Sequence, residues 1–570
     1  MGIPKFFKWM NDSGLFKDAI ISSLPSSVDL FAIDMNALVY DNLSPLMIET
    51  IRSEGLLRFS TEEFNKRKLK VFNGVLSDII GMVRTVKPKY TLLLAFDGVA
   101  PQAKIAQQRN RRYLAQRKPE DVFDKNSISP GTEFMFDLDQ FLRDSINNIQ
   151  QGRSMLNNFF PPRVIYSSHL GHGEGEHKIA KYMTSLPDKN QVVVINGMDA
   201  DLIMIYLLRL REGWTNIYLF RNKTKRNQVL TAIDLRAMEK VITTLYPKVP
   251  DPVNDFVTVL FLIGNDFLPH FPSFERIEDA LTALVYGYRD YSNEYSEGVT
   301  DGMFINLLEF QGFLRYILDT SEPALLRKWA ENSDGVIRIC SSASEKCITT
   351  TRVFENDRAY TVRKFNASAF RDAWYSHALG PKDRPMPGGN VYSEADIRDM
   401  CVRYMEGIVW VHKYYFDESG VNLGWTYPYS YAPLFSDVAK LPVLVRADVE
   451  FHTIDSSSIP ISPLEQLVMI LPPSSIAAVP PEIKDLYKET SPVYDLLPST
   501  HLVDSQGKME DWEAIALLPY VNRTRVINAV RSLKLPPQVL QKYANKGWEV
   551  FSKGVMLTGK RAVPFRRTIK

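Results

Sequence analysis

Short apolar runs separated by helical stretches constrain the fold of this chain more than any other feature. Five runs in the first half have the character of buried strands: DLFAIDM, YTLLLAFDG, RVIYSS, QVVVING and TNIYLF. Strands that are apolar on both faces are typical of parallel sheets covered by helices on both sides. The sequence therefore predicts an α/β domain over residues 1–288, with a mostly parallel central sheet flanked by helices.

Acidic residues stand where these apolar runs end. Seven of them lie in the motifs FAIDMN, LAFDGVAP, GEGEHK, NGMDADL and GNDFLPHFP: Asp34, Asp97, Glu174, Glu176, Asp199, Asp201 and Asp266. In open α/β sheets the working residues gather at the carboxyl ends of strands. Each acid alone also fits a helix N-cap or first-turn carboxylate. As a set they would repel one another unless divalent cations neutralised them, and hard oxygen ligands favour magnesium or manganese over zinc. The set therefore predicts the metal site of a nuclease.

A basic stretch follows Asp97 directly. Within it Lys104, Gln108, Arg111 and Arg112 lie at helical spacing, so one helix face could present them to a single anion. Guanidinium groups match phosphate oxygens in a two-pronged geometry, and lysine adds a point charge. A solvated helix face is the alternative for an isolated basic run. The neighbouring carboxylates favour phosphate binding here.

The second half has a different character. Helical and aromatic patterning from Glu394 onward, as in DIRDMCVRYMEGIVWVHKYYF, predicts a helix-rich aromatic domain over residues 394–570 that packs against the first. Residues 289–393 show mixed charge without a clear pattern and are predicted to be a variable connecting segment.

Composition excludes several classes of protein. The three cysteines form no CxxC pair, so we expect neither a disulfide framework nor a cysteine zinc site. A reducing compartment fits this cysteine usage best. No run of about twenty apolar residues is present, so no membrane span is expected. The net charge of +2 carries no information about nucleic acid.

The motifs together resemble the two conserved regions of the Xrn-type 5′→3′ exoribonucleases. The first half contributes MGIPKFFKWM, DMN, DGVAPQAKIAQQRNRR, PGTEFM, GEGEHKIAKYM, GMDADLIM and GNDFLPHFP. The second half contributes YMEGIVWVHKYYF, GWTYPYSYAP, PLEQLVMILPP and MEDWEAIALLPY, in the family's order. The long C-terminal extension of the large family members is not seen, so a compact member is expected.

The resemblance implies a PIN/flap-nuclease-like core and a role for each candidate residue. The seven acids would hold two Mg²⁺ ions, with Mn²⁺ as an alternative, directly or through water. Lys104, Gln108, Arg111 and Arg112 would form a pocket for a terminal 5′-phosphate. Tyr40, at a position where the family usually has histidine, and Trp425 would stack on the first bases. A core role for Trp425 is an equally weighted alternative.

The implied function is processive 5′→3′ hydrolysis of 5′-monophosphorylated single-stranded RNA to nucleoside monophosphates. The decapping machinery is a candidate partner, a monomer is expected, and the expected location is the cytoplasm, with the nucleus left open. A flap-endonuclease-like enzyme would share the acids, but it would carry a glycine-rich helical hairpin after the last acid, which GNDFLPHFPSFERIEDAL does not show. A catalytically silent RNA-binding scaffold is the other alternative, although it would have no need of clustered carboxylates.

Overall fold

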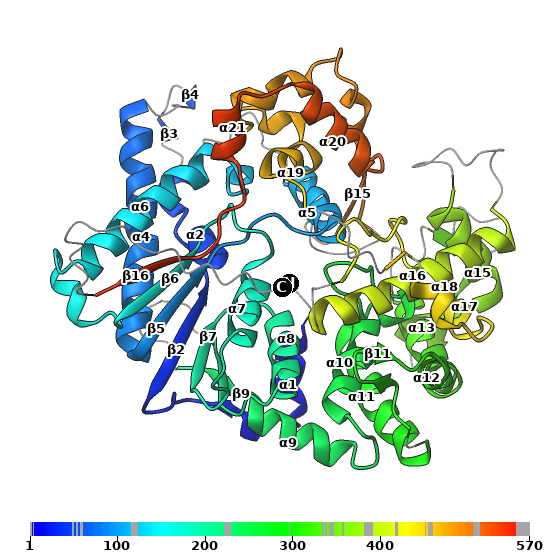
Figure 1. Cartoon of the computed structure of the whole chain (residues 1–570). Coiled ribbons are helices and arrows are strands. Elements are labelled where there is room, and N and C mark those ends of the chain that lie inside the picture. Colours follow the sequence, from blue (N-terminus) through cyan, green and yellow to red (C-terminus); the bar gives the residue numbers. More distant parts are fainter. Residues whose placement is uncertain are drawn as a thin grey trace.

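An eight-stranded sheet forms the centre of the first half of the chain, in the order β1-β9-β8-β7-β2-β5-β6-β16 (Figure 1). The computed structural model describes residues 3, 5–47, 51–52, 55–56, 61–115, 123–221, 230–295, 297–332, 336, 339–340, 347–355, 358–380, 392–416, 420–450, 452–453, 460–505 and 514–553. The strands are β1 (Ile20–Ile21), β2 (Val28–Asp34), β5 (Pro88–Ala95), β6 (Arg163–Ser167), β7 (Val193–Asn196), β8 (Ile217–Phe220), β9 (Ala232–Asp234) and β16 (Glu549–Ser552).

The five strands expected from the sequence are the five parallel ones. β2 lies between β5 and β7, and β6 and β8 continue the parallel pairing outward. The predicted α/β class with a mostly parallel sheet is confirmed. The antiparallel strands at the edges were not anticipated: β9 and β1 extend one side, and β16 pairs with β6 on the other.

Helices cover both faces of the sheet because alternate residues of its strands point to opposite sides. In β2, Phe31 and Ile33 pack on α4 (Thr61–Val86) and α6 (Glu133–Gln150). Leu30 and Ala32 pack on the other face, where α7 (Gly175–Thr184) and α8 (Asp201–Leu210) lie. The strands are therefore apolar throughout.

The middle of the chain, from α9 to α18, is mainly helical and packs against the same face as α8. Its helices are α9 (Leu235–Leu245), α10 (Pro252–Leu260), α11 (Ile277–Glu294), α12 (Leu307–Thr320), α13 (Glu322–Ala330), α15 (Ala367–Ala378), α16 (Glu394–Phe416), α17 (Phe435–Ala439) and α18 (Arg446–Glu450). Along α16 most side chains are buried, including Tyr404, Trp410 and Tyr414. One continuous core runs from the sheet to α16 and crosses both predicted domain boundaries, which stay predictions.

Helix α5 (Gln102–Leu114) lies between the sheet and the last helices of the chain (Figure 1). Ile105 of α5 shares a core with α19 (Pro463–Ile470) and α20 (Arg523–Ser532), and Tyr543, which follows α21 (Pro537–Lys542), belongs to it. The basic helix is thus held by residues from both halves of the sequence. No helix in the described ranges is long and apolar enough to cross a bilayer.

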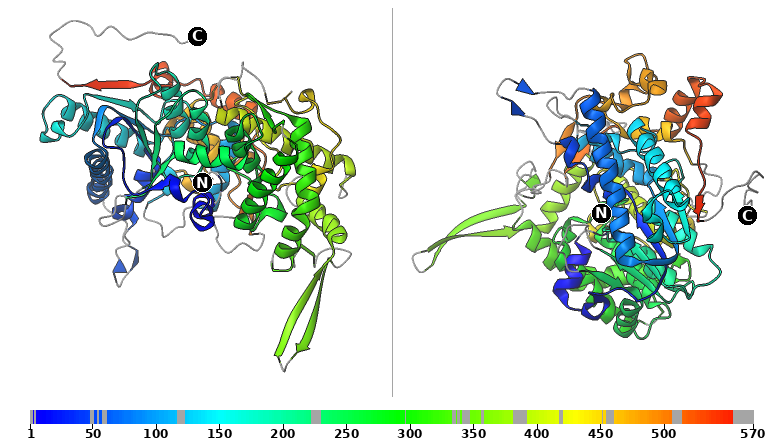
Figure 2. Two further views of the ribbon diagram at one scale, coloured as in Figure 1. Left: turned by 90° about the horizontal axis from the view of Figure 1, so that it is seen from below. Right: turned by 90° about the vertical axis from the view of Figure 1, so that its left-hand side faces the viewer.

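The predicted connecting segment contains ordered structure. Besides α12, α13 and α15 it contributes a hairpin of β12 (Ile348–Glu355) and β13 (Arg358–Phe365), in which Ile348 pairs with Phe365. Figure 2 shows this hairpin, in yellow-green, extending away from the rest of the molecule.

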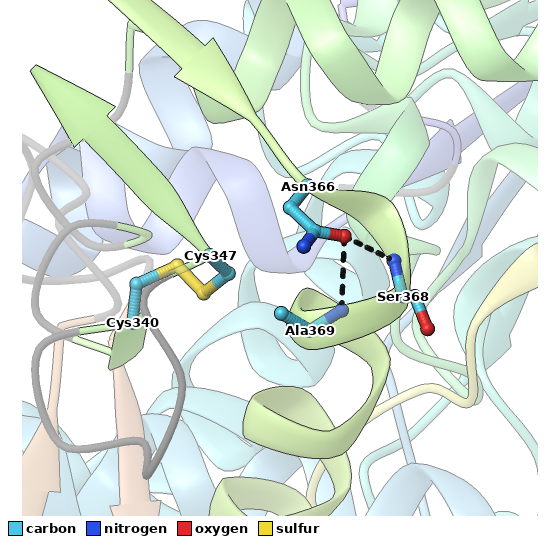
Figure 3. Close-up of a disulfide and its surroundings, with 5 residues drawn as sticks. All are labelled: Cys340, Cys347, Asn366, Ser368 and Ala369. Atoms are coloured by element: carbon cyan, nitrogen blue, oxygen red, sulfur yellow. Dashed lines mark hydrogen bonds between the residues drawn. A yellow bond between two sulfur atoms is a disulfide. The ribbon is translucent and has the colours of Figure 1, made fainter.

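A disulfide joins Cys340 to Cys347 at the base of this hairpin (Figure 3). Both cysteines are buried in the core next to α15, whose first turn is capped by the Asn366 side chain. This single bridge was not anticipated by the sequence analysis, which expected no disulfide framework. An odd cysteine count gives no information about which pair lies close in space. The third cysteine, Cys401, is free and buried in α16.

Candidate active site

The seven predicted acids lie on the elements that border one end of the parallel sheet. Asp34 is the last residue of β2, Asp97 follows β5 by two residues, and Asp201 is the first residue of α8. The remaining acids are Glu174 and Glu176 at the start of α7, Asp199 before α8, and Asp266 after the short helix η4 (Phe261–Ile263). Gly264 makes the turn before Asp266 with a φ of 91°. A Cβ at this position would lie 2.7 Å from the backbone nitrogen of His270, so the turn favours glycine.

Asp34, Asp97 and Glu176 form the tightest group. One carboxylate oxygen from each lies within 4.8 Å of the other two, a spacing that suits a metal ion. Asp34 Oδ1 is buried and has no protein hydrogen-bond partner. A buried, unpartnered carboxylate oxygen is costly unless a cation completes it. A Cβ on Gly175 would come within 2.7 Å of that oxygen, so a glycine is required beside it. These residues fit a divalent cation.

Two hydrogen bonds orient the Asp97 carboxylate in this group. The Gly175 N–H donates to Oδ1 at 2.8 Å, and Asn36 Nδ2 donates to Oδ2 at 2.6 Å. Asn36 was not proposed as a site residue from the sequence, although it lies in the DMN motif with Asp34. Ligand carboxylates commonly depend on such outer hydrogen bonds for their orientation.

Electrostatic coupling extends the group to the other acids. Burial raises the pKa of Asp34 well above its usual range, and the charges of Asp97, Asp199 and Asp201 raise it further. Burial likewise raises the pKa of Glu176, with Glu174, Asp201 and Asp97 adding to the effect. Burial is the main cause that raises the pKa of Asp201 to about 6. The charge of Asp199 adds to this effect, and the charge of Lys104 opposes it. The carboxylates therefore act on one another, and a divalent cation would relieve their repulsion.

Lys104 lies inside the acid cluster. Its ammonium is 2.7 Å from Asp266 Oδ2 and also pairs with Glu174. Burial alone would raise the pKa of Asp266, but Lys104 outweighs it and the pKa falls to about 2. The same ammonium does not dominate at Glu174, because burial and the charge of Asp97 keep that pKa raised, at about 7. The sequence predicted Lys104 as part of a separate phosphate pocket; the structure places it between that helix and the acids.

Tyr414 is a second residue that the sequence analysis missed. Its hydroxyl, from α16, donates to Glu174 Oε1 at 3.0 Å. The motif VHKYYF that contains it was recognised, but nothing in the spacing indicated that α16 reaches α7. Through this bond the second half of the chain supports an acid of the first.

The other members of the basic set lie along α5 beyond Lys104. Arg112 Nε and Nη2 donate to Ser129 Oγ at 3.0 and 2.8 Å, and Nη1 donates to the Gln108 carbonyl at 3.3 Å. Among the described residues, no carboxylate forms an ion pair with Arg112. Burial lowers the pKa of Arg112 to about 10, so the group is charged at neutral pH. Arg111 is exposed and acts electrostatically on Asp266. A half-buried guanidinium without a carboxylate partner is suited to an anionic ligand.

The two predicted stacking rings differ in accessibility. Tyr40, at 46% exposure, is open to solvent, and it lies close enough to Arg112 to raise that group's pKa. Trp425 is 6% exposed and stacks on Trp410, with ring centroids 5.3 Å apart and planes at 22°. The structure gives Trp425 a packing role. Base stacking by either ring stays a prediction.

We expect divalent cations to stabilise this fold in a pH-dependent way. Asp201 and Glu174 have folded-state pKa values of about 6 and about 7, above their usual values. Such groups favour the folded state at low pH, and that contribution is lost as pH rises from about 4 to about 7. Millimolar Mg²⁺ should therefore raise the thermal unfolding temperature more at about pH 7.5 than at about pH 5.5. Differential scanning fluorimetry with NaCl of equal ionic strength as the control measures this. An equal gain at both pH values would contradict it.

Two family models match the chain. The one described as "XRN 5'-3' exonuclease N-terminus" matches residues 1–223, and "Xrn1 helical domain" matches residues 246–366 and 388–543. The 5'-3' exoribonuclease 1 of Schizosaccharomyces pombe is 26% identical, over 93% of this chain and 48% of its own length. The human protein of that name is 25% identical, over 93% of this chain and 34% of its own. The 5'-3' exoribonuclease 2 of Gallus gallus is 26% identical, over 94% of this chain and 70% of its own length.

The chain thus spans half or less of the first two of these relatives. Among solved structures, the catalytic core of Rad2 in complex with a DNA substrate is 13% identical and covers 58% of this chain and 78% of its own, with a TM-score of 0.30. That likeness is too low to carry an argument about function.

Proposed function

We propose that this chain, which belongs to the XRN family of 5′-3′ exonucleases, hydrolyses single-stranded RNA processively from a 5′-monophosphate end to nucleoside monophosphates. The observation that carries the proposal is the position of Lys104. It joins the acid cluster, through Asp266 and Glu174, to a helix on which the half-buried Arg112 forms no ion pair with a carboxylate of the described residues. A scissile phosphate at the acids and a terminal phosphate at the helix would therefore lie on adjoining surfaces.

The acids hold the cations in this proposal. Asp34, Asp97 and Glu176 form the closest ligand group, and Glu174, Asp199, Asp201 and Asp266 complete a site for two Mg²⁺ ions, with Mn²⁺ as the alternative. When bound, such ions lower the pKa of a coordinated water and neutralise charge on the phosphate. The chain's own residues orient the ligands: Asn36 and the Gly175 N–H fix Asp97, and Tyr414 fixes Glu174.

The basic helix selects the 5′ end. Arg112 uses three of its five N–H groups on Ser129 and the Gln108 carbonyl, which leaves two for a phosphate. Arg111, Gln108 and Lys104 supply the remaining donors. A pocket that binds one phosphate in this way disfavours caps and triphosphates, and after each cleavage the new 5′-phosphate can take the same position. Tyr40, being exposed beside Arg112, is the better placed of the two rings to stack on the first base.

The supply of substrate follows from the same chemistry. An enzyme that needs a 5′-monophosphate depends on an activity that removes caps or pyrophosphate from RNA ends. A decapping enzyme in the cytoplasm is the partner that we propose on this ground.

Matched RNAs that differ only at the 5′ end test the proposed function. We expect 5′-monophosphate RNA to be degraded much faster than 5′-triphosphate or 5′-hydroxyl RNA, and turnover to require Mg²⁺ and stop in EDTA. A 5′ label should be released as mononucleotide from the start of the reaction. A 3′-labelled RNA should pass from full length to short end products with few long intermediates, as expected of a processive enzyme. Loss of nucleotides from the 3′ end, or full activity in excess EDTA, would contradict the proposal. A 5′-flap DNA cut internally at its junction would favour the flap-endonuclease alternative, and absence of any turnover would favour the scaffold.

A further inference from the structure

A buried glutamine on α19 contacts the basic helix from behind. Gln466 is fully buried, and its side chain makes two hydrogen bonds to the other half of the chain. Its Oε1 accepts from the Ala100 backbone N–H at 3.0 Å, and its Nε2 donates to Gln108 Oε1 at 3.4 Å. One amide therefore links the residues before α5 to the side chain of Gln108.

The backbone N–H of Ala100 fixes the direction of both amides. It can only donate, so the oxygen of Gln466 must face it and the NH₂ group of Gln466 must face Gln108. The oxygen of Gln108 then accepts the bond from Gln466, and the NH₂ group of Gln108 remains available to donate to a ligand. In the described part of the chain, Gln108 Nε2 donates to no protein group. Reversing Gln108 would present its oxygen to an anion and oppose binding.

The surroundings of Gln466 keep it in this position. It lies in the first turns of α19, where Ser462 and Glu465 form a reciprocal cap and Pro463 occupies the first turn. α19 packs on α5 in a shared core that includes Ile105 and Leu467. A fully buried amide that gave up either bond would leave an unpaired polar group, so both are strongly favoured.

We propose that Gln466 is a positioning residue of the 5′-phosphate pocket, which holds the Gln108 amide with its NH₂ group toward the bound phosphate. This inference rests on the proposed function, in which Gln108 contacts that phosphate. It assigns to the second half of the chain a part in 5′-end specificity.

Two substitutions at one position test the direction of the amide. Gln466→Met removes both hydrogen bonds and keeps the side-chain length. Gln466→Glu keeps an acceptor for Ala100 but offers no donor to Gln108, so Gln108 would turn its NH₂ group toward the new carboxylate. We expect the kcat/KM ratio of 5′-monophosphate to 5′-hydroxyl RNA to fall about three- to tenfold in Gln466→Met, mainly through KM, and further in Gln466→Glu.

Gln311→Met is the matched control. Gln311 is also buried and also bridges two elements, accepting from the Leu444 N–H at 2.8 Å and donating to the Pro442 carbonyl at 3.1 Å. It should lower stability without changing the ratio. In a Gln108→Met background, Gln466→Met should change the ratio by less than about twofold, because the two residues act as a unit.

The possible outcomes distinguish a failure of the proposed function from a failure of the proposed role of Gln466. A parent protein without a 5′-monophosphate preference overturns the proposed function and this inference with it. If the parent has the preference but Gln466→Met leaves the kcat/KM ratio unchanged, the inference alone is overturned. The same holds if the effects of Gln466→Met and Gln108→Met on that ratio are additive in the double variant. An equal fall of the ratio in Gln311→Met would also overturn it, since a general loss of packing would then explain the effect.

Discussion

Asp201→Asn is expected to lower the rate of RNA hydrolysis by about a thousandfold or more while leaving the fold intact. Asp201 is buried at the start of α8, and this burial, with the neighbouring carboxylates Asp199 and Asp266 adding to it, raises its pKa to about 6. Asparagine has nearly the same shape but carries no charge, so it would weaken a cation site without opening a cavity. Single-turnover hydrolysis of 5′-monophosphate RNA in Mg²⁺ measures the loss.

Asp139→Asn is the matched control for that substitution. Asp139 lies on α6, away from the acid cluster, and is also buried. Its Oδ1 accepts a hydrogen bond of 2.8 Å from the Tyr166 hydroxyl. Its variant should keep activity near that of the parent. The Asp201 variant should still bind RNA in a fluorescence anisotropy titration. Turnover within about a hundredfold of the parent would contradict a ligand role for Asp201.

Arg111→Ala is expected to reduce the preference for 5′-monophosphate over 5′-hydroxyl RNA by about tenfold or more. Arg111 is exposed on α5, so its removal costs little packing, and a charge-assisted bond to phosphate is worth about 1.5–3 kcal/mol. The measurement is kcat/KM for both RNAs at two salt concentrations. Arg531→Ala, which removes an exposed arginine from α20, is the control and should leave the ratio unchanged.

A general electrostatic role for α5 predicts a different pattern. Both RNAs would then weaken together, and the dependence on salt would become shallower. A constant ratio in Arg111→Ala would identify the helix as a solvated basic face and leave the direction of degradation without an explanation.

The strands and the acids at their ends could be predicted because both follow from local sequence. An apolar run such as TLLLA can only be a buried strand or helix, and Asp34 and Asp97 follow such runs directly. Parallel strands then bring their carboxyl ends to one edge. The convergence of Glu176 with Asp34 and Asp97 agrees with that argument.

Contacts across long stretches of sequence could not be predicted. Tyr414 reaches Glu174, and Gln466 reaches Gln108, from elements whose placement no spacing reveals. Lys104 lies at helical spacing with Arg111, yet it turns to the acids because an ammonium between two carboxylates is more stable there. Trp425 lies in an aromatic motif, which is equally consistent with a core ring and with a stacking ring.

The pairing of β16 with β6 bears on when the central sheet becomes complete during synthesis. Glu549 lies opposite Tyr166, so the last strand of the central sheet is made long after its neighbour. Contacts between residues so distant along the chain form late, because the intervening chain must first be ordered. Until then the outer edge of β6 has unpaired backbone groups that could join the strand of another molecule. A growing chain therefore carries an open sheet edge from the synthesis of β6 until β16, far along the sequence, has left the ribosome.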